Sequence, residues 1–489
     1  MSAIPMTRRQ VLSALAATSA YSVLPKAAFA DKQRPLNVLI LMCDQYRPDA
    51  LSLYGDKYAI TPNLDKLAKS GVSFRQTYCQ APICVASRNS ILTGRYAHST
   101  GVVTNGCLAA PEQISFPQYL RQKGYFTACF GKLHTPGREE QDWDVLKERQ
   151  KPTRIPPEVR KEMLPQLFAI DGKHPLGAPS PLDETQTQEW KAAEDTIDFL
   201  KEKHDKPWLV QCSFLKPHPP LQPPKRFWDM IDRSKLVVPE HMYPKNDLDD
   251  TNPRYLRRMK GRDLVNLSDD TVKDAMQGYY ANLAFADDQF GRVLKQLDDS
   301  GMRENTLVLF FADHGEMLDD HRLWAKMVFF DPAVRVPLIA HLPGRIEGGR
   351  QTKALVELID IFPTLMDLLG YRTPPSAQGK SFLRLAEGKT STHKQAVYSE
   401  FPNIPMFKPD GNYNPTRMQF DGRYKVIDNG PDIEPELYDL QKDPHEITNL
   451  CHEPAQKKRV QDTVAHLRSW AKIDAVPVHP ITQKVADPG

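Results

Sequence analysis

The chain has 489 residues, of which 40% are hydrophobic and 26% are charged, and its formal net charge is +3. This composition is ordinary for a globular protein with a large core. The mean hydropathy of -0.51 argues against a protein with several membrane spans. The seven cysteines are spread thinly, and their spacings match neither a disulfide scaffold nor a zinc ribbon.

The first thirty residues predict a targeting segment. Arg8 and Arg9 precede a mild apolar stretch over residues 11–24, and Lys26 separates this stretch from Ala28-Phe29-Ala30, which has the pattern of a cleavage site. The stretch is too short and too rich in Ala and Ser to span a bilayer stably. We therefore expect no stable membrane insertion, although an uncleaved anchor is the alternative.

A twin-arginine signal peptide over residues 1–30 fits this pattern best. It predicts cleavage near Ala30, export by the Tat machinery, and a mature protein in the periplasm or outside the cell. Removal of the segment takes away Arg8, Arg9 and Lys26 and no acid, so the net charge becomes 3 − 3 = 0. A neutral chain gives no reason to expect nucleic acid as a partner.

Alternating buried strands and amphipathic helices follow along the chain. Short apolar or β-branched runs predict strands at 36–42, 126–130, 208–214 and 306–312. Helical patterns cover 189–204 and 271–297, and a short helix begins at Pro62 with Thr61 as its cap and ends at Gly71. This order predicts an α/β fold, a large and mostly parallel sheet sandwiched by helices.

Polar side chains follow each of the four predicted strands. In chain order they are Asp44, Lys132 with His134, His218, and Asp313 with His314. Ligands of open α/β sheets bind outside the carboxyl ends of the strands. These distant segments are therefore expected to form one site.

Two proline-rich stretches, 135–185 and 216–265, read as long loops that shape a pocket over this edge of the sheet. After Gly370 the pattern changes to short strands such as 424–427 and a helix near 456–470. We expect a catalytic domain over residues 31–384 and a smaller C-terminal α+β domain over residues 385–489.

The segment Cys84-Val85-Ala86-Ser87-Arg88, followed by Thr93-Gly94, resembles the signature of the sulfatase family, which is Cys-x-Pro-Ser-Arg with Thr-Gly five residues later. Only the proline differs, since Ala86 takes its place. The resemblance implies that a formylglycine-generating maturase oxidises Cys84 to formylglycine, and Ala86 favours a radical-type maturase. The plainer alternative is a buried cysteine before an ordinary helix.

The resemblance extends along most of the chain and implies an alkaline-phosphatase-like fold. The closest patterns are those of choline-sulfatase-like and arylsulfatase-like members. The matching elements are Asn37-Val38-Leu39-Ile40 before Asp44, Thr61-Pro62-Asn63-Leu64, Gly131-Lys132-Leu133-His134, Lys216-Pro217-His218, Asp313-His314-Gly315-Glu316, Lys326, and Glu436-Leu437-Tyr438-Asp439.

The resemblance also implies a divalent metal at the site. Its expected ligands are Asp44, Gln45, the modified Cys84, Asp313 and His314. Many relatives have a second aspartate at the position of Gln45, so this site carries less negative charge than usual. Ca²⁺ is the first expectation because carboxylate oxygens suit a hard cation, and Mn²⁺ or Mg²⁺ comes next.

Six residues are expected to carry the catalysis: Cys84, Arg88, Lys132, His134, His218 and Lys326. A hydrated aldehyde at residue 84 is the nucleophile. Arg88 and Lys132 hold it, and Lys132 and Lys326 clamp the sulfate oxygens. His134 helps to expel sulfate and His218 protonates the departing alcohol. Taken singly, each of these residues could equally be structural.

The predicted function is a sulfuric ester hydrolase that cleaves a small-molecule or sugar sulfate monoester. A phosphonate or phosphodiester hydrolase of the same superfamily is the first alternative, and a sulfamidase is a variant of it. A non-catalytic binding protein is the second, if Cys84 stays unmodified. The substrate itself is not decided by the sequence.

Overall fold

The computed structural model describes residues 35–148, 161, 176–239, 267–402, 415–431 and 433–478. The chain from Leu36 to Gly489 forms one compact unit. The predicted signal peptide, residues 1–30, lies outside the described residues. The same holds for much of the two predicted pocket loops, at 149–160, 162–175 and 240–266.

Five parallel strands form one half of a nine-stranded sheet. Their order is β4 (Val145–Lys147), β3 (Phe126–Gly131), β5 (Trp208–Pro217), β1 (Asn37–Asp44) and β6 (Thr306–Ala312). All eight residues of β1 and all seven of β6 are buried, as continuous apolar runs require in a sheet that is covered on both faces. The four predicted strands are confirmed.

The other half of the sheet is mixed. β8 (Leu338–His341) pairs antiparallel with both β6 and β2 (Val72–Tyr78), β7 (Arg335–Val336) pairs antiparallel with β2, and β9 (Arg350–Glu357) runs parallel to β2. These four strands were not predicted. The sheet as a whole is nevertheless mostly parallel, as expected.

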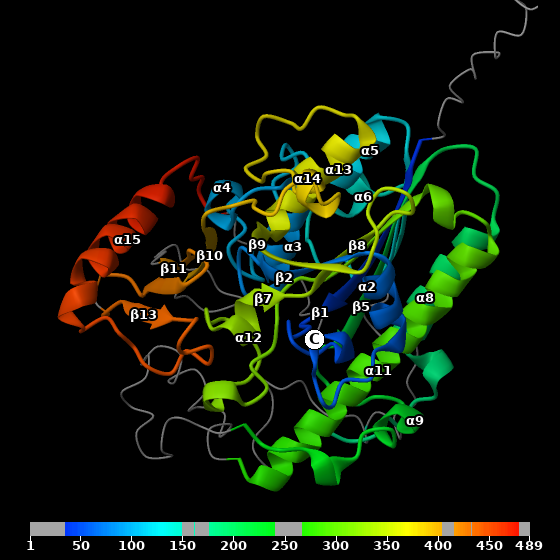
Figure 1. Cartoon of the computed structure of the whole chain (residues 1–489). Helices are drawn as coiled ribbons and strands as arrows, with labels where there is room; N and C mark the ends of the chain where they lie inside the picture. The colour runs from blue at the N-terminus through cyan, green and yellow to red at the C-terminus, as the bar shows by residue number, and fades with distance from the viewer. Residues whose placement is uncertain are drawn as a thin grey trace, which may run out of the picture. The chain divides into compact units, whose positions relative to one another are not determined.

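Two groups of helices pack on the sheet (Figure 1). One group contains α2 (Pro62–Ser70), α8 (Gln188–Lys201) and α11 (Asp269–Asp299), which confirms the three predicted helices. The other contains α3 (Cys84–Thr93), α5 (Phe116–Gln122) and α13 (Ile361–Leu369). Thr61 does precede α2, but its side chain makes no capping bond. Its hydroxyl donates instead to Asp65 Oδ1, 3.1 Å away.

Shorter helices join these elements. The α-helical ones are α4 (Ala97–Thr100), α6 (Glu139–Asp142), α9 (Lys225–Trp228), α12 (Asp331–Val334) and α14 (Leu383–Ala386). Single 3-10 turns cover Ser52–Tyr54, Glu184–Gln186, Arg233–Lys235, Arg303–Asn305, Asp320–Arg322, Leu358–Asp360 and Pro454–Gln456.

A second sheet stands near the C-terminus, with α15 (Lys457–Trp470) against it. Its four antiparallel strands are β10 (Val397–Pro402), β11 (Pro415–Phe420), β12 (Tyr424–Asp428) and β13 (Glu436–Asp439). The smaller α+β part is thus confirmed. Met418 and Ile427 of this sheet belong to the same hydrophobic cluster as Val38 of β1, so the two sheets share one core. The predicted domain boundary between residues 384 and 385 stays a prediction.

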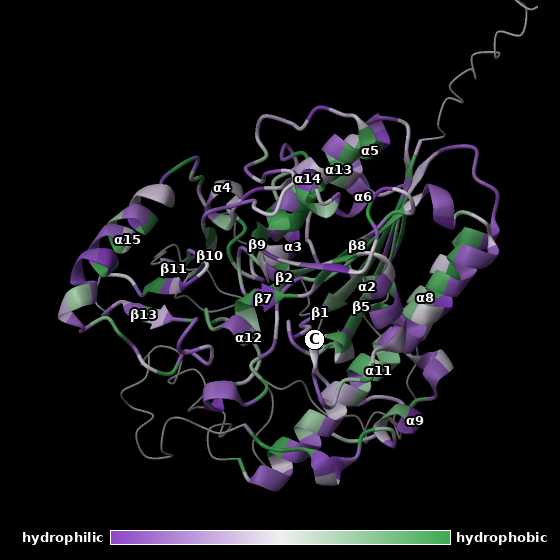
Figure 2. Cartoon of the chain, viewed as in Figure 1, coloured by the Kyte–Doolittle hydropathy of each residue, from purple (hydrophilic) through white to green (hydrophobic). Residues whose placement is uncertain are grey.

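The distribution of hydropathy follows these layers. In Figure 2 the strands of the large sheet are mainly hydrophobic, whereas α8 and α15 alternate between hydrophobic and hydrophilic residues along their length. This alternation is typical of helices that cover a core with one face. Among the described residues, no helix combines the length and the apolar character needed to cross a membrane.

Candidate active site

The carboxyl ends of the central strands bring the predicted acidic residues together. Asp44 is the last residue of β1, and Asp313 and His314 follow β6, its neighbour in the sheet. Cys84 joins them from the first residue of α3. One ligand atom from each of these four residues lies within 4.8 Å of the other three, so we call this group the donor cluster.

Cys84 contacts two other members of the donor cluster. Its Sγ is 3.1 Å from His314 Nε2 and 3.8 Å from Asp44 Oδ1, and the residue is only 2% exposed. Ile83, the N-cap residue, makes no side-chain capping bond, and Asn105 Oδ1 instead accepts from the Val85 amide at 3.0 Å. The dipole of α3 favours negative charge at residue 84.

Arg88 lies one turn further along α3 and joins the two carboxylates. Its Nε donates to Asp313 Oδ2 at 2.7 Å, and its Nη2 donates to Asp44 Oδ2 at 3.3 Å. Its Nη1 donates to the carbonyl of Lys132 at 2.9 Å, which fixes the segment after β3. The i, i+4 spacing places Arg88 on the helix face that carries Cys84.

Lys132 supplies the second positive charge, because its Nζ lies 2.6 Å from Asp44 Oδ2. Burial alone would raise the pKa of Asp44, but the charge of Lys132, with those of His314 and Arg88, outweighs it and holds this pKa well below its usual range. Burial opposes the charge of Lys132 as well, yet Asp44 raises the pKa of the amine. Both groups therefore stay ionised at neutral pH.

The surroundings of Cys84 favour the ionised form of its thiol. Burial and Asp44 both oppose its ionisation, but the charges of Lys326, Lys132 and His314 outweigh them and hold the Cys84 pKa well below its usual range. An environment that stabilises a thiolate here also stabilises an ionised oxygen at the same position.

The two predicted catalytic histidines both reach Cys84. Hydrogen bonds with the Cys84 side chain contribute to the pKa of His134 and of His218. His218 Nδ1 lies 2.8 Å from the carbonyl of Pro219, so the neutral ring carries its proton on Nδ1 and presents Nε2 to the site. Burial and then Lys326 lower the pKa of His218 to about 4.

His134 has a left-handed backbone conformation, with φ of 52°. Its amide donates to Glu148 Oε1 at 2.9 Å, and the amide of Leu133 donates to the same oxygen at 3.1 Å. One carboxylate oxygen therefore holds an unusual backbone shape. Burial and the charge of Lys132 lower the pKa of His134.

Gln45 and Lys326 stand beside the donor cluster. Gln45 Oε1 accepts a hydrogen bond from Lys326 Nζ, and Gln45 Nε2 donates to Glu316 Oε2. Glu316 Oε1 also accepts from the amides of Leu318 and Ala325, at 2.9 and 2.5 Å. The role of Gln45 as a metal ligand stays a prediction, since the structure shows its side-chain oxygen bonded to Lys326.

All of the predicted site residues thus come together at one edge of the sheet. Glu148 and Glu316 are not among the predicted catalytic or metal-binding residues. Glu316 stands in the matched segment after Asp313, so its position could have drawn attention, whereas Glu148 follows the short strand β4 and carries no local signal.

A buried cysteine between carboxylates and lysines, at the carboxyl edge of a mostly parallel sheet, is typical of the active site of a hydrolase with an α/β architecture. The family model "Sulfatase" matches residues 36–371, and the model "N-sulphoglucosamine sulphohydrolase, C-terminal" matches residues 319–472. The chain belongs to the sulfatase family. The predicted assignment to the sulfuric ester hydrolases is therefore confirmed, and formylglycine and a metal are general to this family.

Curated relatives agree with this assignment. An arylsulfatase of Clostridium perfringens is 30% identical over 87% of this chain and 92% of its own length. A choline-sulfatase of Rhizobium meliloti is also 30% identical, over 86% of this chain and 83% of its own.

Solved structures confirm the alkaline-phosphatase-like fold. The phosphonate monoester hydrolase from Silicibacter pomeroyi has a TM-score of 0.76 at 24% identity, and the match covers 92% of this chain and all of that one. A structure in complex with its substrate D-glucosamine-2-N,6-O-disulfate has a TM-score of 0.71 at 22% identity, over 90% of this chain and 99% of that one.

Proposed function

We propose that the chain hydrolyses sulfate monoesters with a hydrated formylglycine at residue 84 as the nucleophile. The observation that carries the proposal is the donor cluster, in which Cys84 Sγ shares a space 4.8 Å across with Asp44, Asp313 and His314. The positive groups of Arg88 and Lys132 border the same space.

The cluster suits a divalent cation. Two carboxylates and an imidazole are buried with their ligand atoms within 4.8 Å of one another, and oxygen and nitrogen donors of these types bind divalent cations. Asp44, Asp313, His314 and the oxygen of a modified residue 84 would hold the ion, with Gln45 as a further ligand. Ca²⁺ is our first choice, before Mn²⁺ and Mg²⁺. When bound, such an ion stabilises negative charge on the oxygens around it.

Before the first step, one hydroxyl of the hydrated aldehyde loses its proton to solvent, which the positive groups around residue 84 favour. In the first step, the ionised oxygen forms a bond to sulfur while the bond from sulfur to the alcohol oxygen breaks. Lys132 and Lys326 neutralise the sulfate oxygens through this exchange. His218 Nε2 faces residue 84 and, in the protonated ring, supplies the proton that the departing alcohol needs. The alcohol leaves and the sulfate remains bonded to residue 84.

In the second step, the remaining hydroxyl of residue 84 gives its proton to His134. The bond from carbon to the sulfate oxygen breaks, the aldehyde forms again and inorganic sulfate leaves. Water then hydrates the aldehyde. Two easier displacements replace one difficult hydrolysis, which is the advantage of a covalent intermediate.

We infer that the substrate is a small-molecule or sugar sulfate. Support comes from the relatives named choline-sulfatase, iduronate 2-sulfatase and ulvan-active sulfatase, and from the substrate in the structure with a disulfated glucosamine. Export by the twin-arginine route to the periplasm or outside the cell, after cleavage near Ala30, is part of the same proposal, as is modification of Cys84 by a maturase. The pattern at Arg8 and Arg9 supports export.

The test begins with peptide mass spectrometry of residue 84 in protein made together with a radical-type maturase. The modified protein is then assayed with aryl, choline and sugar sulfates and with a phosphonate monoester. We expect formylglycine at residue 84, and sulfate release that a Cys84→Ala variant lacks. Turnover by protein whose residue 84 is only the intact thiol would refute the mechanism, and a preference for the phosphonate would favour the alternative.

A further inference from the structure

The loop that carries Lys326 is held in an unusual shape. Residues 316–331, which we call the lysine loop, include six non-glycine residues with positive φ: Leu318, Asp319, His321, Arg322, Ala325 and Met327. Such conformations persist only where the surroundings impose them. The position of Lys326 therefore depends on whatever holds this loop.

The two ends of the loop are held together by backbone hydrogen bonds between the segment after β6 and α12. At these two ends, which we call the neck of the loop, the amides of Gly315 and Glu316 donate to the carbonyls of Ala333 and Pro332, at 2.8 and 2.9 Å. A Cβ on Gly315 would lie 1.9 Å from the Pro332 oxygen, so the neck requires glycine. Glu316 then bridges the loop through its side chain, as described above.

Its second half is held from the C-terminal sheet. Lys425 of β12 is completely buried, and its Nζ donates to the carbonyl of Phe329 at 3.0 Å and to Asp331 Oδ1 at 2.7 Å. The same Nζ lies 2.6 Å from Glu446 Oε1, while Glu446 Oε2 accepts from the amide of Asp331 at 2.6 Å. The side chains of Lys425, Asp331 and Glu446 therefore hold the backbone three and five residues after Lys326.

A neighbouring contact points the same way. His321 stacks on Phe330 with ring centroids 4.1 Å apart, and its Nε2 lies 2.9 Å from the carbonyl of His445. On the other side, the amide of Met327 donates to the carbonyl of Pro82 at 3.0 Å, two residues before Cys84. The loop thus connects the C-terminal sheet to the start of α3.

A buried ionic group of this kind contributes little net stability, because desolvation offsets the attraction between the charges. Its value lies in the one geometry that it permits. We propose that Lys425 is a positioning residue for sulfate binding: with Asp331 and Glu446 it fixes the lysine loop, so that the C-terminal sheet sets the place of Lys326. The inference rests on the proposed contact of Lys326 with sulfate.

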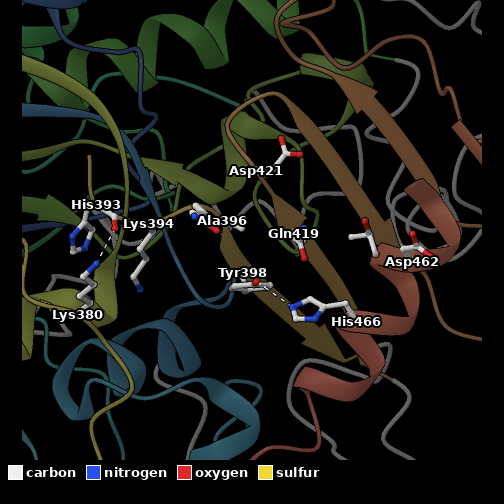
Figure 3. A pocket seen from close by; sticks show the side chains of 11 residues that line it. Lys380, His393, Lys394, Ala396, Tyr398, Gln419, Asp421, Asp462 and His466 are labelled. Carbon is white, nitrogen blue, oxygen red and sulfur yellow. Dashed lines mark hydrogen bonds between the residues drawn. The ribbon is translucent and has the colours of Figure 1, made fainter. Parts of the chain in front are cut away.

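The experiment compares Lys425→Met with a matched control, Lys394→Met. Lys394 also lies between two buried carboxylates, since its Nζ pairs with Glu357 and lies 2.7 Å from Asp360 Oδ1, although its own side chain is 13% exposed. It lines the pocket in Figure 3, whose lining includes no residue of the lysine loop. Both variants leave two buried carboxylates without their lysine, so general destabilisation is common to both.

The measurements are kcat and KM for a nitrophenyl sulfate and the inhibition constant of inorganic sulfate, made on metal-loaded, modified enzyme. We expect Lys425→Met to raise KM and the sulfate inhibition constant roughly 10- to 100-fold, the usual cost of removing a group that orients a ligand. Lys394→Met should change the inhibition constant by less than about twofold. If Lys425→Met does not fold, Glu446→Gln keeps the shape and weakens the same clasp.

A double variant, Lys425→Met with Lys326→Ala, tests separately whether Lys425 acts through Lys326 and whether Lys326 binds sulfate. If Lys425 acts through Lys326, the double variant should bind sulfate no worse than Lys326→Ala alone. Additive losses, or equal losses in Lys425→Met and Lys394→Met, would overturn the inference. Unchanged sulfate inhibition in Lys326→Ala would instead overturn the proposed role of Lys326, and the inference with it.

Discussion

Replacing His218 by asparagine tests whether this ring supplies a proton to the leaving alcohol. Burial and Lys326 lower the pKa of His218 to about 4, so roughly one molecule in a thousand of the free enzyme carries the imidazolium at pH 7. The profile of kcat/KM against pH reports groups of the free enzyme. For an alkyl sulfate, kcat/KM should therefore rise about tenfold for each unit by which pH falls from 7 toward 4.

A nitrophenyl sulfate needs no such proton, because nitrophenolate is a good leaving group. The assay is the ratio of kcat/KM for the alkyl sulfate to kcat/KM for the nitrophenyl sulfate, measured between pH 5 and 7. Every group that acts on both substrates cancels in this ratio. In His218→Asn the ratio should lose its pH dependence, and alkyl turnover should fall roughly 10²- to 10⁴-fold.

His341 provides the control for this experiment. Burial and the charge of Arg303 lower its pKa to about 4 as well, but it lies in β8, and His341→Asn should keep the slope of the wild-type ratio. A ratio that does not change with pH in the wild-type enzyme would refute the role of His218 as an acid. The ring would then serve only to position the substrate.

Three further outcomes are expected. Arg88→Met should lower the free energy of unfolding of the metal-free protein by roughly 3–5 kcal/mol, because two buried carboxylates lose their partner. In urea titrations, added Ca²⁺ should make this loss smaller. An equal loss with and without Ca²⁺ would contradict the metal site. The pKa of His341 is about 4 in the folded protein and about 6.5 in the unfolded chain. Between these pH values only the unfolded chain is protonated at this residue, so the free energy of unfolding should fall by up to about 3 kcal/mol as pH falls from 6.5 to 4. His341→Asn should lack this loss in urea titrations at pH 7 and 4.5. Replacing Arg8 and Arg9 by lysine should leave uncleaved precursor in the cytoplasm on cell fractionation, and normal export of that variant would indicate the general secretory route.

The central strands could be predicted because burial on both faces makes them continuous apolar runs. β2 and β9 could not, since their sequences, Val72–Tyr78 and Arg350–Glu357, mix polar and apolar residues. Such a segment is not distinguished from a loop by its own residues. β8 is too short, at four residues, for any periodicity to be seen.

The site followed from two kinds of local information, polar residues directly after strands and the signature at Cys84. Positioning groups are a different case. Glu148 bonds backbone amides 14 and 15 residues before it, and Lys425 reaches the lysine loop from nearly a hundred residues away. Neither contact leaves a pattern in the sequence around the residue, because only the tertiary fold creates it.

The burial of α3 means that residue 84 can be modified only before the chain has folded. All ten residues of the helix are buried, so a modifying enzyme cannot reach the cysteine once the chain has folded around it. Oxidation therefore competes with folding, and each molecule that folds first keeps its thiol for as long as it stays folded. The specific activity of a preparation should thus depend on the fraction of chains that the maturase modifies before they fold. Slower synthesis or folding should raise that fraction and yield more active enzyme from the same gene.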